Sequence, residues 1–341
     1  MVVVMDAAAS DEQIDAVVAL VNDSGGDAFV SRGEQRTIVG LVGDIERFLD
    51  LNIENLPGVA ETVRISTPFK LVSRDHHRAR STVWVGPAGH RVPIGPATLT
   101  TIAGPCAVET PEQTLAAARL AMTLGATILR GGAYKPRTSP YAFQGLGVAG
   151  LRILADVRAE TGLPVVTEIV DAEDIDVVAD YADMLQVGTR NMANFALLQA
   201  LGSVGKPVLL KRGMSATIEE WLMAAEYIAQ RGNLEIVLCE RGIRTFETAT
   251  RNTLDISAVP VVQGLSHLPV IVDPSHSGGR RELVAPLSRA AVAVGADGVI
   301  IDVHPDPRTA LCDGPQALTA DDLGDLSQSL AALAAVMGRG T

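Results

Sequence analysis

A regular alternation of short apolar runs and longer stretches with helical periodicity constrains the fold most strongly. It begins near residue 101 and repeats about every 25–35 residues. The apolar runs are Thr101–Ala107, Thr127–Ala133, Pro164–Val170, Ala182–Thr189, Pro207–Gly213, Glu235–Gly242, Pro269–His276 and Gly298–Pro305. Helical stretches follow most of them: Pro111–Leu124, Leu146–Thr161, Asn191–Leu201, Thr217–Arg231 and Arg280–Val294. Strands that alternate with helices in this way indicate parallel βαβ units.

The number of these units favours a closed barrel. Eight units within residues 101–341 fit a (β/α)8 TIM barrel, which typically needs about 250 residues. The alternative is an open, doubly wound α/β sheet, in which a G-x-G-x-x-G motif would be expected directly after the first strand. No such motif follows the first run, so we predict the barrel.

Residues 1–66 show a different order, β-α-β-β-α-β, which is the ferredoxin-like α+β pattern. The strands are expected at Met1–Met5, Asp27–Ser31, Thr37–Val42 and Val59–Ile65, the helices at Asp11–Asn22 and Gly43–Leu51, with Ser10 as N-cap and a turn at Arg32-Gly33-Glu34. Residues 67–100 are predicted to form a linker (68–81, polar and charged) and a β-hairpin (82–95).

Charge and cysteine content narrow the class of protein. The chain has a net charge of -12, whereas proteins that bind nucleic acid or anionic membranes are usually basic. Its N-terminus lacks a signal peptide, and no apolar run approaches the length of a membrane span. The three cysteines are far apart in sequence, which favours a reducing compartment. We therefore expect a cytoplasmic enzyme.

Cationic residues gather at the predicted carboxyl ends of the strands, where the active sites of such barrels lie. They are Arg130, Lys135, Arg137, Arg190, Lys211 and Arg241. Arginine binds phosphate and carboxylate oxygens in a two-pronged manner and lysine adds a point charge, so the group predicts a substrate with several negative charges. The alternative is that each cation pairs with a neighbouring Asp or Glu.

A second group at the strand ends combines a thiol, an imidazole and two carboxylates: Cys106, His276, Asp302 and Asp313. The first and eighth strands are neighbours in a closed barrel, so these side chains can converge. A mixed set of S, N and O donors suits Zn, Fe, Mn or Co better than Mg or Ca. The alternative for Cys106 is a small buried apolar residue.

Several longer segments carry a family resemblance. They are AGPCAVE (103–109), LRGGAYKPRTSPYAFQGLG (129–147), QVGTRNMANF (186–195), LLKRGM (209–214), CERGIRTFET (239–248), VDPSHSGG (272–279) and DVHPDPRTALCDG (302–314). TIVGLVGD (37–44) and KLVSR (70–74) extend the match into the first 75 residues. The chain resembles 3-deoxy-D-arabino-heptulosonate 7-phosphate (DAHP) synthases of the short, metal-dependent type with an N-terminal ferredoxin-like regulatory domain.

The resemblance implies condensation of phosphoenolpyruvate with erythrose 4-phosphate, the first step of the shikimate pathway. It implies that phosphoenolpyruvate is bound by Arg130, Lys135, Arg190, Lys211 and Arg241, the aldose phosphate by Arg137 and Thr138, and a divalent metal (Mn, Fe, Co or Zn) by Cys106, His276, Asp302 and Asp313. The family pattern has Glu at the position of Asp302. Lys135 could donate a proton to the aldehyde oxygen, and Glu168 or a metal-bound water could activate the attacking water.

Three rival functions remain open. A 3-deoxy-octulosonate 8-phosphate synthase would use a pentose phosphate, but that family resembles K-A-N-R-S where this chain has Lys135-Pro136-Arg137-Thr138. A Schiff-base aldolase would need a solitary desolvated lysine, with Lys211 as the candidate. A non-catalytic amino-acid-sensing barrel would not need the charged strand ends. The resemblance also implies an aromatic amino acid as effector of residues 1–66, and we expect a homodimer or homotetramer.

Overall fold

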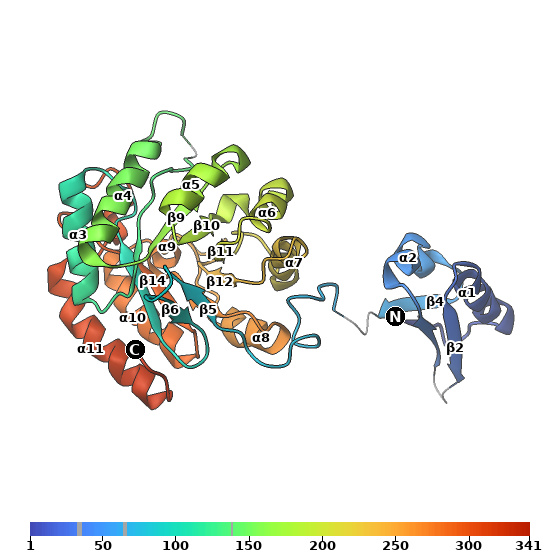
Figure 1. The fold of residues 1–341 in the computed structure, drawn as a ribbon. Coiled ribbons are helices and arrows are strands. Elements are labelled where there is room, and N and C mark those ends of the chain that lie inside the picture. Colours follow the sequence, from blue (N-terminus) through green and yellow to red (C-terminus); the bar gives the residue numbers. More distant parts are fainter. Residues whose placement is uncertain (33–35, 64–66, 138) are drawn as a thin grey trace. The chain divides into compact units, whose positions relative to one another are not determined.

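The computed structural model describes residues 1–32, 36–63, 67–137 and 139–341 (Figure 1). The chain folds as two compact units, Met1–Pro68 and Phe69–Thr341, each with its own core. Within the described part of the chain, no helix is long and apolar enough to cross a membrane.

The first unit has the predicted β-α-β-β-α-β order. Its elements are β1 (Val2–Met5), α1 (Asp11–Asp23), β2 (Asp27–Arg32), β3 (Thr37–Val42), α2 (Ile45–Asp50), a 3-10 turn η1 (Ile53–Asn55) and β4 (Val59–Val63). The antiparallel sheet has the order β2-β3-β1-β4. Ser10 caps α1 in a capping box with Gln13, as the Ser-x-x-Gln spacing favours. Arg32 of the predicted turn is the last residue of β2, whereas Gly33, Glu34 and the end of the last predicted strand lie outside the described residues.

The second unit is a closed barrel of eight parallel strands, so the predicted barrel is confirmed. The strands are β7 (Thr100–Gly104), β8 (Ile128–Arg130), β9 (Val165–Ile169), β10 (Met184–Val187), β11 (Val208–Lys211), β12 (Ile236–Glu240), β13 (Val270–Val272) and β14 (Gly298–Asp302). Each strand pairs with the next along the chain, and β14 pairs with β7 to close the ring. All carboxyl ends therefore meet at one rim.

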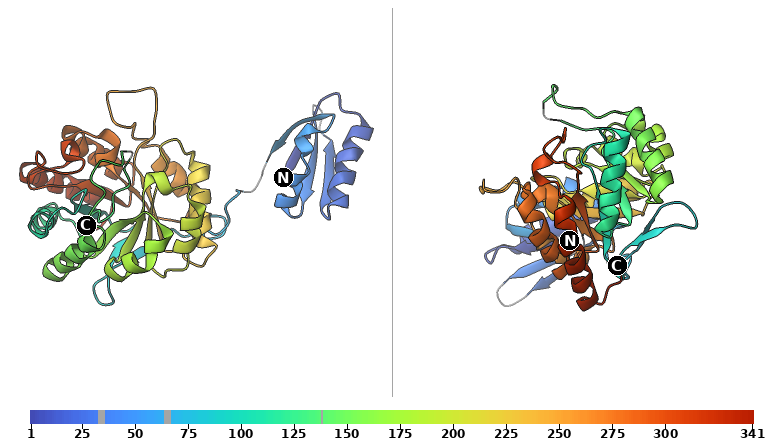
Figure 2. Two further views of the ribbon diagram at one scale, coloured as in Figure 1. Left: turned by 90° about the horizontal axis from the view of Figure 1, so that it is seen from above. Right: turned by 90° about the vertical axis from the view of Figure 1, so that its left-hand side faces the viewer.

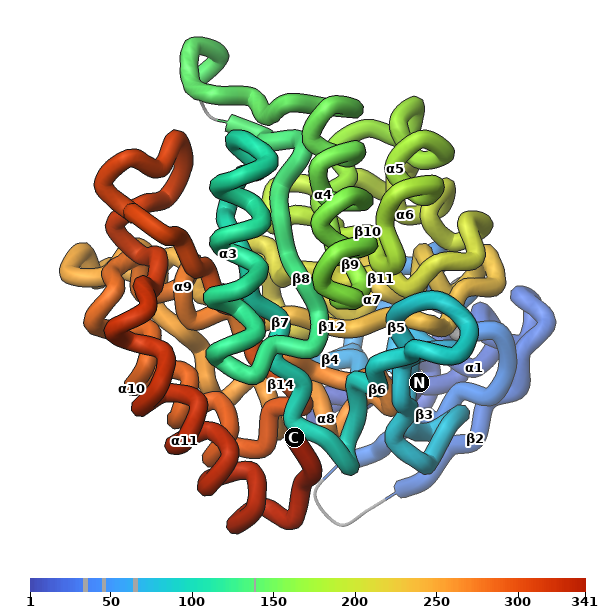
Figure 3. The backbone as a smooth tube through the Cα atoms, turned by 60° about the vertical axis from the view of Figure 1, so that its left-hand side comes forward, coloured from blue at the N-terminus to red at the C-terminus, as the bar shows by residue number. Residues whose placement is uncertain are grey.

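Helices surround the barrel (Figures 1 and 3). They are α3 (Pro111–Thr123), α4 (Val148–Thr161), α5 (Ile175–Tyr181), α6 (Phe195–Leu201), α7 (Ile218–Ala229), α8 (Ala258–Leu265), α9 (Pro274–Gly278), α10 (Arg281–Ala293) and α11 (Ala320–Val336). The C-terminal helix α11 lies between α10 and α3, which completes the outer layer next to β14 and β7 (Figure 3). Figure 2 shows the same layers from two further directions.

A small hairpin closes the amino end of the barrel. It consists of β5 (Val83–Val85) and β6 (Val92–Ile94), which lie in the region predicted to form a hairpin. Val83, Val85 and Ile94 are buried in one cluster with inward-facing residues of all eight strands. The amide of Leu99 donates to the Gly340 carbonyl at 2.7 Å, which ties the C-terminus to the residues that precede β7. The interior is thus filled from this end, and the functional face is at the other.

The segment after Pro68 differs from the predicted linker because it packs on the barrel. Phe69 and Val72 are buried with the main core. The amides of Leu71 and Val72 donate to the carboxylate of Glu226 on α7 at 3.0 and 3.1 Å. The sequence pattern of this segment does not predict its packing on the barrel, because isolated apolar residues lie between charged ones. The unit boundary falls at residues 68 and 69, and residues 69–100 belong to the barrel unit.

Candidate active site

A cavity of about 430 Å³ opens at the carboxyl ends of the strands. It is lined by all six cationic residues predicted from the strand ends, Arg130, Lys135, Arg137, Arg190, Lys211 and Arg241, and by Glu168, His276 and Asp313. Thr138, the remaining predicted substrate contact, lies outside the described residues. The cavity is polar and predominantly cationic, as a site for anionic substrates must be.

Two of the six cations pair with buried carboxylates. Arg130 forms an ion pair with Asp302, and Lys211 forms one with Asp273. The alternative of pairing with neighbouring acids therefore applies to these two residues. Ion pairs of this kind fix the cations in place while the cavity side of each group stays available.

Arg241 shows the opposite situation. Its side chain is buried, and its Nη1 has no hydrogen-bond partner among the described residues. Burial lowers the pKa of this guanidinium, although the nearby Asp273 raises it in part. Buried donors are nearly always paired, so this N–H group, which lines the cavity without a protein partner, indicates a position where a ligand oxygen binds.

Lys135 lies beside Cys106. Its Nζ donates to the Cys106 carbonyl at 2.9 Å and to Sγ at 3.2 Å. Burial would lower the pKa of Lys135, but attraction to Cys106, Cys312 and Glu168 outweighs burial and raises it. The ammonium therefore keeps its proton at neutral pH and can act as a donor.

Glu168, on β9, also faces the cavity. Its Oε2 accepts a 3.4 Å hydrogen bond from Gln186 Nε2 on the neighbouring β10. Gly188 makes room for this carboxylate, since a Cβ at that position would lie 1.8 Å from Glu168 Oε1. Any other residue at position 188 would displace the acid.

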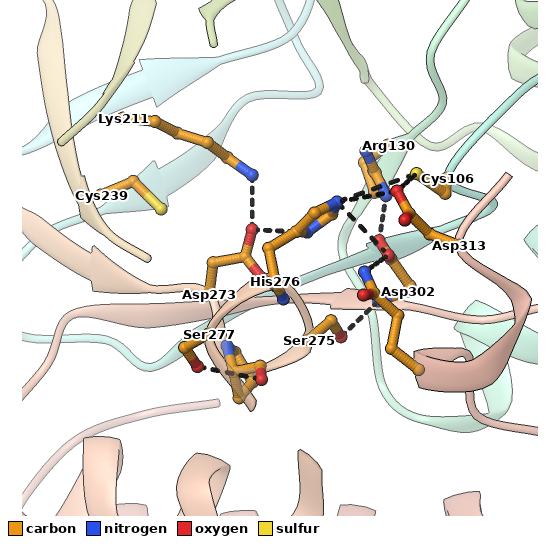
Figure 4. Close-up of polar contacts among 12 residues, drawn as sticks. Cys106, Arg130, Lys211, Cys239, Asp273, Ser275, His276, Ser277, Asp302 and Asp313 are labelled. Atoms are coloured by element: carbon orange, nitrogen blue, oxygen red, sulfur yellow. Dashed lines mark hydrogen bonds and ion pairs between the residues drawn. The ribbon is translucent and has the colours of Figure 1, made fainter. Parts of the chain in front are cut away.

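Three predicted metal donors converge at the rim between β7, β13 and β14 (Figure 4). Cys106 Sγ lies 3.1 Å from Asp313 Oδ2 and 3.8 Å from His276 Nε2. Asp313 Oδ2 and His276 Nε2 lie 3.6 Å apart. Cys106 follows β7, and His276 belongs to the short α9, which Asp273 caps through the His276 amide. Asp313 has a left-handed backbone with φ of 52°.

The pKa values of these groups are shifted by burial and by the charges and hydrogen bonds of their neighbours. Burial would lower the pKa of His276, but Asp273, whose Oδ2 lies 2.9 Å from Nδ1, and Asp302 raise it to about 10. The hydrogen bond to Cys312 and burial raise the pKa of the Cys106 thiol. Burial would raise the pKa of Asp313, but contacts with His276, Arg251 and Cys106 bring it well below its usual range.

This donor set fits a divalent transition metal. Ligands around a tetrahedral Zn, with Zn–S near 2.3 Å and Zn–N or Zn–O near 2.0–2.2 Å, stand about 3.3–3.8 Å apart. The observed separations of 3.1 to 3.8 Å are close to that range. The Nδ1 face of His276 is oriented by Asp273, a common arrangement for a histidine that binds a metal through Nε2.

Asp302, the fourth predicted ligand, is not a member of this trio but contacts it through His276. It is buried, one carboxylate oxygen pairs with Arg130, and the other accepts from Gln316 Nε2 at 2.6 Å. Its Oδ2 lies 3.6 Å from His276 Nε2, the same separation as between His276 Nε2 and Asp313 Oδ2. The role of Asp302 as a metal ligand therefore stays a prediction.

Several residues at the site were not predicted as members of it. Arg244 and Arg251 line the cavity, and Arg251 Nη1 donates to Asp313 Oδ1 at 3.0 Å and to Gln316 Oε1 at 2.9 Å. Cys312 lies 3.6 Å from Cys106, Sγ to Sγ, and accepts from Arg137. Their positions in the sequence could have indicated them, because these residues lie in the loops that follow β12 and β14, at the carboxyl ends of the strands.

Comparison with known proteins identifies the family. The model of the DAHP synthetase I family matches residues 82–337, and that of the DAHP synthase ferredoxin-like domain matches residues 1–67. The phospho-2-dehydro-3-deoxyheptonate aldolase of Thermotoga maritima is 51% identical over 99% of both chains. A 2-dehydro-3-deoxyphosphooctonate aldolase of Syntrophotalea carbinolica is 37% identical over 69% of this chain and 91% of its own.

Solved structures agree in fold. The crystal structure of the Thermotoga maritima DAHP synthase superposes with a TM-score of 0.90 at 49% identity and covers 99% of this chain and 98% of its own. A truncated form of that synthase, at 51% identity and a TM-score of 0.73, covers 80% of this chain and 98% of its own. Both the catalytic-domain match and the whole-chain similarity lead to the same conclusion: the chain belongs to the DAHP synthetase I family.

Proposed function

We propose that the chain condenses phosphoenolpyruvate with D-erythrose 4-phosphate and water to give DAHP and phosphate, the first step of the shikimate pathway. The observation that carries this proposal is one cavity in which six cationic side chains lie with His276 and Asp313, two of the three grouped metal donors. Two phosphates and a carboxylate need such a set of cations, and an aldehyde needs an electrophilic activator.

The cations divide between the two substrates. Arg130, Lys211 and Arg241 lie at the ends of β8, β11 and β12, and with Lys135 and Arg190 they bind the phosphate and carboxylate of phosphoenolpyruvate. The unpartnered Nη1 of Arg241 supplies one donor for these oxygens. Arg137 and Thr138, farther along the loop after β8, bind the aldose phosphate.

The chemistry follows from the positions of Lys135 and Glu168. The C3 carbon of phosphoenolpyruvate forms a bond to the aldehyde carbon, and the aldehyde oxygen takes a proton from the Lys135 ammonium. Water adds to C2 and gives its proton to Glu168. The resulting phosphohemiketal breaks its carbon–oxygen bond to phosphate, its hydroxyl proton leaves with the phosphate, and the keto product remains. Both groups line the same cavity, as such a sequence requires.

We further propose a divalent metal, Mn, Fe, Co or Zn, held by Cys106, His276 and Asp313, with Asp302 beside His276 as the fourth predicted ligand. When bound, it would supply Lewis acidity toward the aldehyde carbonyl. Lys135 and its contact with Cys106 Sγ place the proton donor next to this position.

The rival activities fit less well. Lys211 is not solitary but forms an ion pair with the buried Asp273, and this pairing disfavours a Schiff base. The similarity to the 2-dehydro-3-deoxyphosphooctonate aldolase covers 69% of this chain, against 99% for the heptonate aldolase, and the segment after β8 reads Lys135-Pro136-Arg137-Thr138. A sensor without activity would have no use for the buried Lys135 and Glu168 facing one cavity.

The experiment is a phosphate-release assay with phosphoenolpyruvate and a panel of four-carbon and five-carbon aldose phosphates, before and after chelation. We expect release with erythrose 4-phosphate that stops on chelation and returns with added metal. Greater activity with arabinose 5-phosphate would contradict the substrate, and full activity after verified removal of metal would contradict the metal. Lys135→Met should lose turnover, with the exposed Lys70→Met as matched control.

For residues 1–67 we propose a regulatory role with an aromatic amino acid as effector. The match to the DAHP synthase ferredoxin-like domain supports it. Inhibition requires that the effector favour one state of the small domain over another. Inhibition assays with phenylalanine, tyrosine and tryptophan test this role, and indifference to all three would contradict it. The expected homodimer or homotetramer remains a prediction for sedimentation analysis.

A further inference from the structure

The buried amide of Gln316 is a feature that the proposed mechanism does not use. The side chain is 2% exposed, and it is not among the described residues that line the cavity. Its Nε2 donates to Asp302 Oδ2 at 2.6 Å, and its Oε1 accepts from Arg251 Nη1 at 2.9 Å. A buried side chain that makes two such charge-assisted hydrogen bonds is held firmly in one place.

The two neighbours also determine which way the amide points. A carboxylate only accepts hydrogen bonds, and a guanidinium only donates them. A flipped amide would direct its oxygen at Asp302 and its NH2 group at Arg251, and both contacts would be repulsive. Gln316 therefore links an anion to a cation, and an apolar side chain of similar length would make neither contact.

The local backbone brings Gln316 to this position. Asp313 has a left-handed backbone with φ of 52°, and the 3-10 turn η4 (Gly314–Gln316) follows it directly. The chain then returns alongside the end of β14, where the Leu318 amide donates to the Asp302 carbonyl at 2.9 Å. The turn thus places Gln316 beside Asp302, although 14 residues separate them in sequence.

Through these two contacts Gln316 acts on both carboxylates that are predicted to bind the metal. Asp302 Oδ2, the oxygen that it contacts directly, lies 3.6 Å from His276 Nε2. Arg251 donates to Asp313 Oδ1 at 3.0 Å, and Asp313 Oδ2 lies 3.6 Å from His276 Nε2 (Figure 4). One amide thereby orients two carboxylates toward the same imidazole nitrogen, one directly and one through Arg251.

We propose that Gln316 is a positioning residue for the metal, because it orients Asp302 and Asp313 toward His276 and is not itself a lining residue of the cavity. This inference rests on the metal dependence of the proposed function. Removal of a group that holds metal ligands typically lowers metal affinity about 10–100-fold. Asp302 Oδ1 keeps its ion pair with Arg130 when the amide is lost, so metal affinity should change more than affinity for phosphoenolpyruvate.

The test titrates full-length, metal-free protein with Co²⁺ in competition with a chelator and follows the visible absorption of the bound ion. Gln316→Met keeps a side chain of similar length and removes both hydrogen bonds. We expect this variant to bind Co²⁺ about 10–100-fold more weakly than wild type. The matched control is Gln263→Met on α8, which loses a 2.7 Å hydrogen bond to the Gly295 carbonyl and should keep the wild-type affinity.

Two further measurements separate positioning from a general loss of stability. Gln316→Asn keeps the amide but retracts it by about 1.5 Å, the length of one carbon–carbon bond. It cannot reach both partners, so Co²⁺ affinity should again fall about tenfold, even if Gln316→Met fails to fold. At saturating metal, KM for phosphoenolpyruvate should change less than about threefold in either variant, because the ion pair of Arg130 with Asp302 remains.

The outcomes separate this inference from the proposed function. Folded variants of Gln316 that bind Co²⁺ as tightly as wild type would overturn the inference, and chelator-sensitive phosphate release would still stand. Weaker Co²⁺ binding in these variants without any phosphate release by the wild type would keep Gln316 as a positioning residue and reject the activity. A wild-type protein that binds no Co²⁺ would reject both the proposed metal and this inference.

Discussion

Single residues at this site illustrate how buried charge is used. Arg241 is desolvated without a complete set of partners, whereas Arg130 and Lys211 each face a carboxylate. Burying a donor without a partner costs free energy that a bound anion returns. The buried Arg241 therefore lowers the stability of the ligand-free protein and raises its affinity for an anion, as is common at functional sites.

Replacement of Arg241 tests both effects, on the stability of the ligand-free protein and on its affinity for the substrate. We expect Arg241→Met to raise the free energy of unfolding of the ligand-free protein by about 1 kcal/mol, because an unpaired buried cation is removed. Charge-assisted hydrogen bonds are worth about 1.5–3 kcal/mol, so KM for phosphoenolpyruvate should rise about 10–100-fold. Urea unfolding and steady-state kinetics measure the two effects, and a stability loss with unchanged KM would reverse the interpretation.

Asp302 and His276 should respond differently to substitution. Asp302→Asn keeps a polar partner beside Arg130 and Gln316 and leaves the donor cluster intact, so metal affinity should fall by no more than about 100-fold. KM for phosphoenolpyruvate should rise because Arg130 loses the negative charge of its ion-pair partner. His276→Ala removes a donor and should lose the metal. Competition titrations against a metallochromic chelator decide, and equal losses would make Asp302 a direct ligand.

At the scale of elements, the segment 69–83 is held against the barrel by His267 and Glu226. His267 Nε2 lies 2.9 Å from the Leu71 carbonyl, its Nδ1 lies 2.8 Å from Ser81 Oγ, and its ring lies against that of His77. Burial lowers the pKa of His267; Leu71 and Glu226 oppose this and His77 adds to it. The neutral ring is therefore the form that fits the docked segment.

This shift predicts a pH dependence of stability. Below the unfolded histidine pKa of about 6.5, the unfolded chain binds a proton that the folded chain does not. The free energy of unfolding should therefore decrease as the pH falls from 7 toward the lowered pKa of the folded state. His267→Gln should flatten this part of the profile relative to His90→Gln, an exposed control. Urea unfolding at pH 5 to 8 measures it, and parallel profiles would contradict the prediction.

The elements show what the sequence could and could not predict. Strands and their polar ends follow from local periodicity, so the barrel, the cationic cavity and the trio of Cys106, His276 and Asp313 were foreseeable. The partners of Asp302 were not, because Arg130 and Gln316 come from other parts of the chain. Cys312 was hidden for the same reason, since its neighbour Cys106 is 206 residues away.

For the whole molecule, the boundary between the two units matters more than the predicted linker implies. Phe69 and Val72 belong to the core of the barrel unit, although they precede its first strand by many residues. Any separation of the units must therefore leave this segment attached to the barrel.

Two truncations test the boundary. A chain that starts at Thr67 should keep barrel stability and turnover and lose inhibition by an aromatic amino acid. A chain that starts at Ser73 lacks Phe69 and Val72 and should be less stable by about 3–6 kcal/mol, because each fully buried apolar side chain contributes about 1.5–3 kcal/mol. Thermal and urea unfolding compare them, and equal stability would show that the docked segment is dispensable.

The hairpin that closes the amino end of the barrel also limits the route by which a metal and the substrates can enter and leave. With β5 and β6 packed against the strand interior, the proposed metal and both substrates would share the opening at the opposite rim. Bound phosphoenolpyruvate should then block departure of the metal. At ten times its dissociation constant, about one site in eleven is open, so inactivation by a chelator should slow about tenfold. A rate that ignores phosphoenolpyruvate would reveal a separate exit. In cells, substrate supply would thereby determine how long each enzyme molecule keeps its metal.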